Sequence, residues 1–289
     1  MSYRIFNHMK NIFGYNNFLD YDLNYVKNFI LTKIKEAKID NINSINFNYI
    51  EINELFPLDY YLNFTRFVEW ATPILKHHKM VADDSTNKLY LDMLTLKNVD
   101  KIDDKIIINY LTDFKEIIKL ISKELFQKFK DQNLVPSYLK ELPTEEPFGQ
   151  ILVREDKCFS INPHLHGKFE ILDCLYYFPN TSDDITQGTV IYKKISDEVP
   201  NFLTGKGSAA GDSGKEGIRE GYENFDYKYF QEVKKFDYTP NKIIAWLNNS
   251  HSFHGSNPMA TDTPMTENKK YVFFGLISGA KSIKLMENW

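Results

Sequence analysis

The stretch NKIIAWLNNSHSFHGSNP, residues 241–258, joins a short apolar run to a polar turn that contains two histidines. The apolar run is rich in branched and aromatic residues and has the length of a buried β-strand. His251 and His254 follow it directly, and Gly255 lets the backbone approach a ligand closely. Because binding residues often follow the end of a rigid strand, the stretch predicts a β-scaffold with a site at this end.

A second pair of histidines lies in INPHLHGKFE, residues 161–170. His164 and His166 flank one leucine, so on an extended chain their side chains point the same way. Imidazole is a common metal ligand, although a lone histidine pair is more often a polar surface feature. Four of the chain's seven histidines fall in these two strand-end segments, which favours a metal site. His251, three residues before His254, is expected to line the mouth of the site or to face solvent, and it is the reserve ligand.

The first half of the chain predicts helices, because apolar residues recur there every three or four positions. These helices are expected at 21–38, 57–80 and 103–131, with one alternating strand at 44–52. After a proline-containing connection at 134–149, short runs typical of strands recur at 150–155, 169–178, 188–195, 241–248 and 270–278. We therefore expect an α+β protein in which a helical N-terminal region, residues 1–140, packs on a β-sandwich or barrel, residues 141–289.

Composition narrows the classes of protein that this chain can represent. Hydrophobic residues make up 43% of the chain, enough for a packed core, and the formal charge of −4 argues against a dedicated nucleic-acid binder. No apolar run has the length of a membrane helix or a signal peptide, and two cysteines provide no disulfide framework. We therefore expect a cytoplasmic protein. The sequence does not indicate an oligomeric state. The glycine-rich segment 204–221 predicts a flexible insert over a site.

Five segments in this order resemble the Fe(II)- and 2-oxoglutarate-dependent oxygenases of the prolyl-hydroxylase-like kind: INPHLH, LDCLYYFPN, QGTVIYKK, NKIIAWLNNSHSFHGSNP and KKYVFFGLIS. The resemblance covers residues 148–280, and the Ser-Phe-His-Gly piece is its most specific part. It implies a double-stranded β-helix, or jelly roll, with iron at its open end. It also implies a reaction in which 2-oxoglutarate and dioxygen become succinate and carbon dioxide while a C–H bond of the substrate is hydroxylated.

The resemblance also implies a set of metal ligands. His164 would be the first iron ligand and His254 the distal one, whereas His166 stands where the family has an aspartate. Three histidines leave as many open positions on iron as two histidines and a carboxylate, but no anionic ligand then offsets the metal's double charge. A displaced carboxylate from Glu170 or Asp173, both near in sequence, would compensate for this loss.

For 2-oxoglutarate, the resemblance implies contacts from three further segments. Tyr176 or Tyr177 would donate a hydrogen bond to it, and Thr189 would line another wall of the site. Lys270, or in second place Lys269, stands where the family has an arginine that pairs with the far carboxylate. Lysine replaces the planar fork of arginine by a point charge, which holds a carboxylate with less geometric control.

Two other interpretations remain open. His164, His166 and Glu170 also match the first metal motif of cupins, in which case the protein would be a three-histidine metal dioxygenase that does not use 2-oxoglutarate. The glycines of that motif are missing, and the interval to His254 is long for a cupin. The third interpretation is a catalytically degenerate oxygenase fold that binds a partner. The oxygenase is our leading hypothesis, with a small molecule or a protein side chain as its substrate.

Overall fold

The computed structural model describes residues 21–77, 82–83, 88–92, 105–135, 145–154, 163–165, 170–179, 188–196, 227–249, 251–256 and 270–278. Its helices are α2 (Leu23–Glu36), α3 (Leu58–His77) and α4 (Lys105–Asp131). All three were expected from the periodicity of the sequence. The oxygen of Asp22 accepts hydrogen bonds from the backbone N–H groups of Asn24 and Tyr25, which caps α2 at its start. None of the described helices is long and apolar enough to cross a membrane.

Among the described residues, eight strands form one antiparallel sheet in the order β1-β2-β9-β6-β11-β5-β4-β3. Their bounds are Ile39–Ile42 (β1), Phe47–Asn53 (β2), Lys242–Leu247 (β9), Glu170–Tyr177 (β6), Lys270–Ser278 (β11), Glu145–Arg154 (β5), Lys88–Asp92 (β4) and Ala82–Asp83 (β3). A second antiparallel sheet has the order β10-β7-β8, with bounds His254–Ser256 (β10), Thr189–Lys194 (β7) and Phe230–Lys235 (β8). Helices combined with antiparallel sheets confirm the α+β class.

The larger sheet takes strands from both sides of residue 140. β2 pairs with β9, and β4 pairs with β5, so strand pairing crosses the division expected between the two parts of the chain. The expected connection at 134–149 is corrected, because β5 already begins at Glu145 and pairs with β11 over nine residues. Backbone pairing with a long neighbour stabilises this segment as a strand, although polar and apolar residues do not alternate in its sequence.

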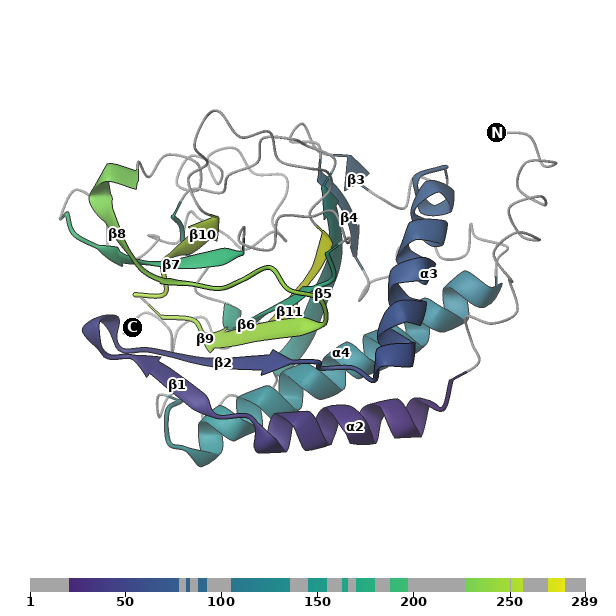
Figure 1. Cartoon of the computed structure of the whole chain (residues 1–289), viewed down its shortest axis with the longest axis horizontal. Helices are drawn as coiled ribbons and strands as arrows, with labels where there is room; N and C mark the ends of the chain where they lie inside the picture. Colours follow the sequence, from purple (N-terminus) through teal and green to yellow (C-terminus); the bar gives the residue numbers. More distant parts are fainter. Residues whose placement is uncertain are drawn as a thin grey trace.

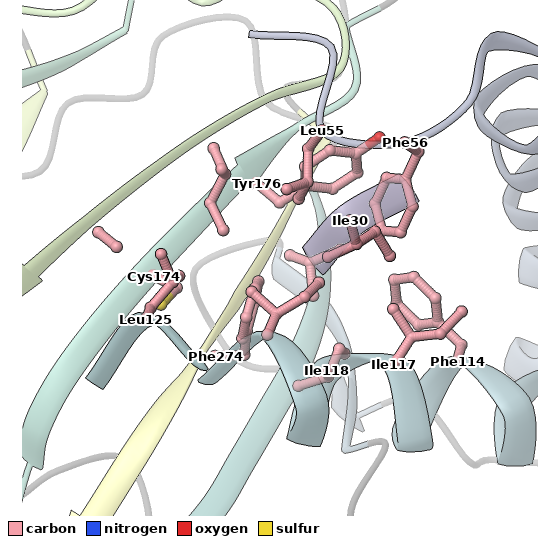
Figure 2. Close-up of a cluster of buried hydrophobic side chains, with 14 of the residues drawn as sticks. Ile30, Leu55, Phe56, Phe114, Ile117, Ile118, Leu125, Cys174, Tyr176 and Phe274 are labelled. Atoms are coloured by element: carbon pink, nitrogen blue, oxygen red, sulfur yellow. The ribbon is translucent and has the colours of Figure 1, made fainter. Parts of the chain in front are cut away.

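The larger sheet has two differently packed faces. α2 and α4 run side by side along one face, and the smaller sheet lies on the other side (Figure 1). On the helix side, Cys174 and Tyr176 of β6 belong to one buried cluster with Phe114 and Ile118 of α4 (Figure 2). On the opposite side, which we call the inner face, Leu175 of the same strand joins another cluster. The alternation of a strand therefore divides neighbouring residues of β6 between the helix side and the inner face.

Asn241 ties the connection between β2 and α3 to the larger sheet. Its side-chain oxygen accepts hydrogen bonds from the Phe56 N–H (3.0 Å) and the Tyr176 hydroxyl (3.1 Å), and its amide nitrogen donates to the Phe56 carbonyl (2.8 Å). Asn241 adopts a left-handed φ of 56°, which asparagine tolerates better than most residues, just before β9. One side chain thus satisfies three buried polar groups on two other segments.

Candidate metal centre

His164 and His254 meet across an isolated antiparallel bridge, although 90 positions separate them in the sequence. The His164 N–H donates to the His254 carbonyl at 2.9 Å, and the His254 N–H donates to the His164 carbonyl at 3.0 Å. Their imidazole rings lie 4.4 Å apart between centroids. Both residues are almost fully buried, at 4% and 3% exposure. Two imidazoles held at this separation in a buried site are suited to share one metal ion.

The residues beside the two histidines explain why the rings turn inward. Leu165 and Phe253 are buried in a cluster on the other side of the smaller sheet, together with Val190. Neighbouring side chains of an extended segment project to opposite sides, so burial of these two apolar residues directs both histidines toward the inner face. Neither Leu165 nor Phe253 was singled out from the sequence, but each occupies the alternating position next to a histidine.

On the inner face, the indole of Trp246 contacts His254. The two ring centroids lie 4.8 Å apart in an edge-on arrangement. Trp246 belongs to the inner-face cluster with Leu175, Tyr177 and Ile191, the β7 residue that pairs with His254. The sequence predicts Trp246 only as a core residue. Its contact with His254 becomes visible in the tertiary structure.

A hydrogen bond to the backbone sets the tautomer of His254. Its Nδ1 lies 2.9 Å from the carbonyl oxygen of Ser252, which can only accept a hydrogen bond. Nδ1 therefore carries the proton, and in the neutral ring Nε2 carries the lone pair that a metal requires. The turn itself is held by Ser252, whose hydroxyl is fully buried and donates to Asn248 Oδ1 at 2.9 Å. The donor set at His254 thus fits a metal that accepts imidazole nitrogen.

Two further histidines, His166 and His251, were candidate metal ligands. His166 lies outside the described residues, and its role as a ligand stays a prediction. His251 is exposed, as expected of a residue at the mouth of the site or in solvent. Within the part of the chain that the structure describes, no group of three or more His, Cys, Asp or Glu side chains could hold a metal. The described site therefore provides two donors, His164 and His254.

The two tyrosines considered for 2-oxoglutarate lie on opposite faces of the larger sheet. Tyr177 is on the inner face, where its hydroxyl forms a hydrogen bond with the Thr189 hydroxyl and accepts one from the Thr189 N–H at 3.2 Å. Burial raises the pKa of Tyr177, and its bonds with Thr189 lower that pKa by less, so the phenol is protonated at neutral pH. Tyr176 is in the helix-side core and donates to Asn241. Tyr177 and Thr189, but not Tyr176, therefore share the inner face with the histidines.

Side chains along β11 alternate between the two faces of the larger sheet, and this alternation concerns the two candidate anchors, Lys269 and Lys270. Tyr271 and Phe273 pack against the inner-face cluster, whereas Val272 and Phe274 belong to the helix-side core. The inner face of β11 is thus made by residues with odd numbers. Lys270 begins the strand and pairs in register with Val153, and Lys269 lies outside the described residues. The role of either lysine stays a prediction.

Of the two carboxylates expected near the metal, Asp173 is fully buried in the middle of β6. Its register partners are Trp246 on β9 and Gly275 on β11. It lies two residues from Leu175 on the same strand, and therefore on the inner face. Glu170 begins β6 opposite Ile277, next to a register shift in β11. The glycine-rich segment 204–221 lies outside the described residues.

Comparison with known proteins finds solved structures that are similar in fold but low in sequence identity. No family model and no curated protein matches the chain. A prolyl 4-hydroxylase from Phytophthora capsici is 11% identical with a TM-score of 0.46, covering 90% of this chain, which spans 66% of that protein. A Pseudomonas putida prolyl-4-hydroxylase is 7% identical with a TM-score of 0.43, covering 87% of this chain and 100% of that one.

A third likeness is to the epimerase SnoN in complex with Fe³⁺, α-ketoglutarate and nogalamycin RO. It is 9% identical with a TM-score of 0.40, covering 91% of this chain and 90% of that one. By their names, these structural neighbours are two prolyl 4-hydroxylases and one epimerase in complex with Fe³⁺ and α-ketoglutarate. TM-scores of 0.40 to 0.46 leave the function of this chain to be inferred from its own residues.

Proposed function

We propose that this protein is an Fe(II)- and 2-oxoglutarate-dependent oxygenase that hydroxylates a small organic molecule or a protein side chain. The observation that carries the proposal is the buried pair His164 and His254, bridged through their backbones with ring centroids 4.4 Å apart. Two segments far apart in the sequence, each singled out for its histidines, meet at one point of the fold.

In this proposal His164, His254 and His166 hold the metal. The fixed tautomer of His254 supports it, because a ligating histidine commonly donates its other ring N–H to a carbonyl or carboxylate. The metal with 2-oxoglutarate supplies the oxidising power: substrate C–H, dioxygen and 2-oxoglutarate yield substrate C–OH, succinate and carbon dioxide. The protein contributes orientation and a site shielded from water by the Trp246 ring and the inner-face cluster.

The 2-oxoglutarate site in this proposal adjoins Tyr177 and Thr189. A protonated Tyr177 hydroxyl beside the Thr189 hydroxyl forms a small buried polar site next to the apolar inner-face cluster, and either group can donate to a carboxylate. A lysine at the start of β11 supplies the positive charge. Because residues with odd numbers form the inner face of β11, we include Lys269 beside Lys270 as the anchor to be tested. The larger and smaller sheets would then be the two halves of a double-stranded β-helix.

Anaerobic absorption spectroscopy tests this proposal. Purified protein is loaded with Fe(II), the bound iron is measured, and 2-oxoglutarate is added without oxygen. A visible charge-transfer band is expected, because the keto acid chelates the metal at positions that the protein leaves open. His254→Ala should abolish the band. The exposed His251, three residues away, provides the matched control, and His251→Ala should retain it.

Each result has a clear consequence. Bound iron without a band would exclude 2-oxoglutarate and favour a three-histidine dioxygenase of the cupin kind. Absence of bound iron would leave the degenerate scaffold as the explanation. Lys269→Ala and Lys270→Ala identify the anchor, since only the variant that lacks it should need more 2-oxoglutarate for half-maximal absorption.

A further inference from the structure

Asp173 is a charged residue in one of the least accessible positions of the larger sheet. It is 0% exposed, and it lies on the central strand β6 between two buried residues, Leu172 and Cys174. Strand interiors disfavour aspartate, and a buried carboxylate requires compensating interactions with the groups around it. The position of Asp173 in the sheet indicates on which part of the protein its charge can act.

Asp173 lies on the inner face, the same face of the larger sheet toward which the histidine pair is directed. Its neighbour in register on β9 is Trp246, and the Trp246 ring lies 4.8 Å from the His254 ring, which in turn lies 4.4 Å from His164. On its other flank, Gly275 of β11 contributes no side chain beside the carboxylate. Asp173 is therefore placed next to the aromatic wall of the histidine site, while Cys174 belongs to the helix side.

Electrostatics makes the carboxylate and the histidines complementary. A divalent metal bound by neutral imidazoles keeps its full double charge, and in a buried site that charge requires compensation. A carboxylate at the next position of the sheet supplies it, because charges separated by little water interact strongly. The charge of Asp173 acts at short range on its surroundings, since after burial it is the second cause that raises the pKa of the Cys174 thiol.

We propose that Asp173 is a positioning residue of the metal centre, whose buried carboxylate provides the negative charge required by a divalent metal on His164 and His254. This inference rests on the metal site of the proposed function. Asp173 does not complete a ligand set with the two histidines in the described part of the chain, so it acts from outside the ligand sphere. Carboxylates around a metal's ligands commonly raise metal affinity about 10- to 100-fold.

Cobalt(II) binding to three purified proteins tests the inference. The metal is titrated into the wild type, Asp173→Asn and Asp173→Glu, and the visible bands of cobalt report affinity and ligand geometry together. Asp173→Asn keeps the shape of the side chain but loses the charge, so its affinity should fall about 10- to 100-fold while the band positions stay unchanged. Asp173→Glu retains the charge and should recover most of the affinity.

Cys174→Ala is the matched control, because it perturbs the same strand on the helix side. Its cobalt affinity should equal that of the wild type. Should Asp173→Asn fail to fold, Asp173→Ser repeats the comparison with a smaller uncharged side chain. Circular dichroism and thermal unfolding establish which variants are folded.

The outcomes separate this inference from the proposed function. Equal affinity in the wild type and Asp173→Asn overturns the role of Asp173 and leaves the metal site standing. Equal losses in Asp173→Asn and Asp173→Glu show that packing, not charge, is required, and also overturn it. Shifted cobalt bands in Asp173→Asn would make Asp173 a direct ligand and contradict a positioning role. A wild type that binds no cobalt removes the metal site itself, on which the inference depends.

Discussion

Replacing each of two adjacent tyrosines by phenylalanine should have separable effects. Tyr176 and Tyr177 are neighbours on β6, yet one belongs to the helix-side core and the other to the inner face. Tyr176→Phe removes one buried hydrogen bond, from the Tyr176 hydroxyl to Asn241 at 3.1 Å. The free energy of unfolding should fall by about 1 kcal/mol, the usual net contribution of such a bond. The affinity for 2-oxoglutarate should not change.

Tyr177→Phe removes both bonds with Thr189 and the proposed donor to 2-oxoglutarate. Unfolding should require about 1–2 kcal/mol less, and 2-oxoglutarate affinity should fall about tenfold or more, because a hydrogen bond to a charged group contributes about 1.5–3 kcal/mol. Urea unfolding followed by tryptophan fluorescence measures the first quantity. Titration of the anaerobic charge-transfer band measures the second.

A double-mutant cycle tests the origin of the Tyr176 effect. Asn241→Gly tolerates the φ of 56° but removes all three side-chain hydrogen bonds, at a cost of about 3 kcal/mol. In that background Tyr176→Phe should cost almost nothing more, which corresponds to a coupling energy of about 1 kcal/mol. The assignment of faces would be refuted if Tyr176→Phe weakened 2-oxoglutarate binding as Tyr177→Phe does, or if its stability cost persisted without Asn241.

Three further changes have defined outcomes. Gly188→Ala places a Cβ 1.8 Å from the Phe236 carbonyl oxygen, so the backbone must shift and unfolding should require about 3 kcal/mol less; unchanged urea unfolding would contradict this strand packing. Lys242→Met breaks the 2.7 Å ion pair with Glu51 and should cost about 2–3 kcal/mol, and less in a Glu51→Gln background. Burial raises the pKa of Cys174 well above its ordinary value, so at pH 8 the thiol is protonated. In a variant whose other cysteine is serine, iodoacetamide should react only after unfolding, and rapid labelling of the folded protein would be the contrary result.

Local pattern was sufficient for most of the elements that build this fold. The stripe of apolar residues that ends at Phe129 is the buried face of α4, and the alternation around Tyr49 is a strand, β2. Short or polar strands were not foreseen: β1, β3, β4, β8 and β10 have few apolar residues or few residues at all. Such segments become strands because a neighbouring strand pairs with their backbone, and for β4, β8 and β10 that neighbour is distant in sequence.

By itself, the sequence determined which residues are candidates for chemistry: two histidine segments, each at the end of a strand, and two tyrosines that must face opposite ways. It could not determine which tyrosine faces inward, because alternation sets relative directions and only packing against α4 assigns each face. Tertiary structure alone decided that His164 meets His254 and that Asp173 lies beside Trp246. Those neighbours depend on strand register across long loops, which is set by the whole core and not by any local stretch.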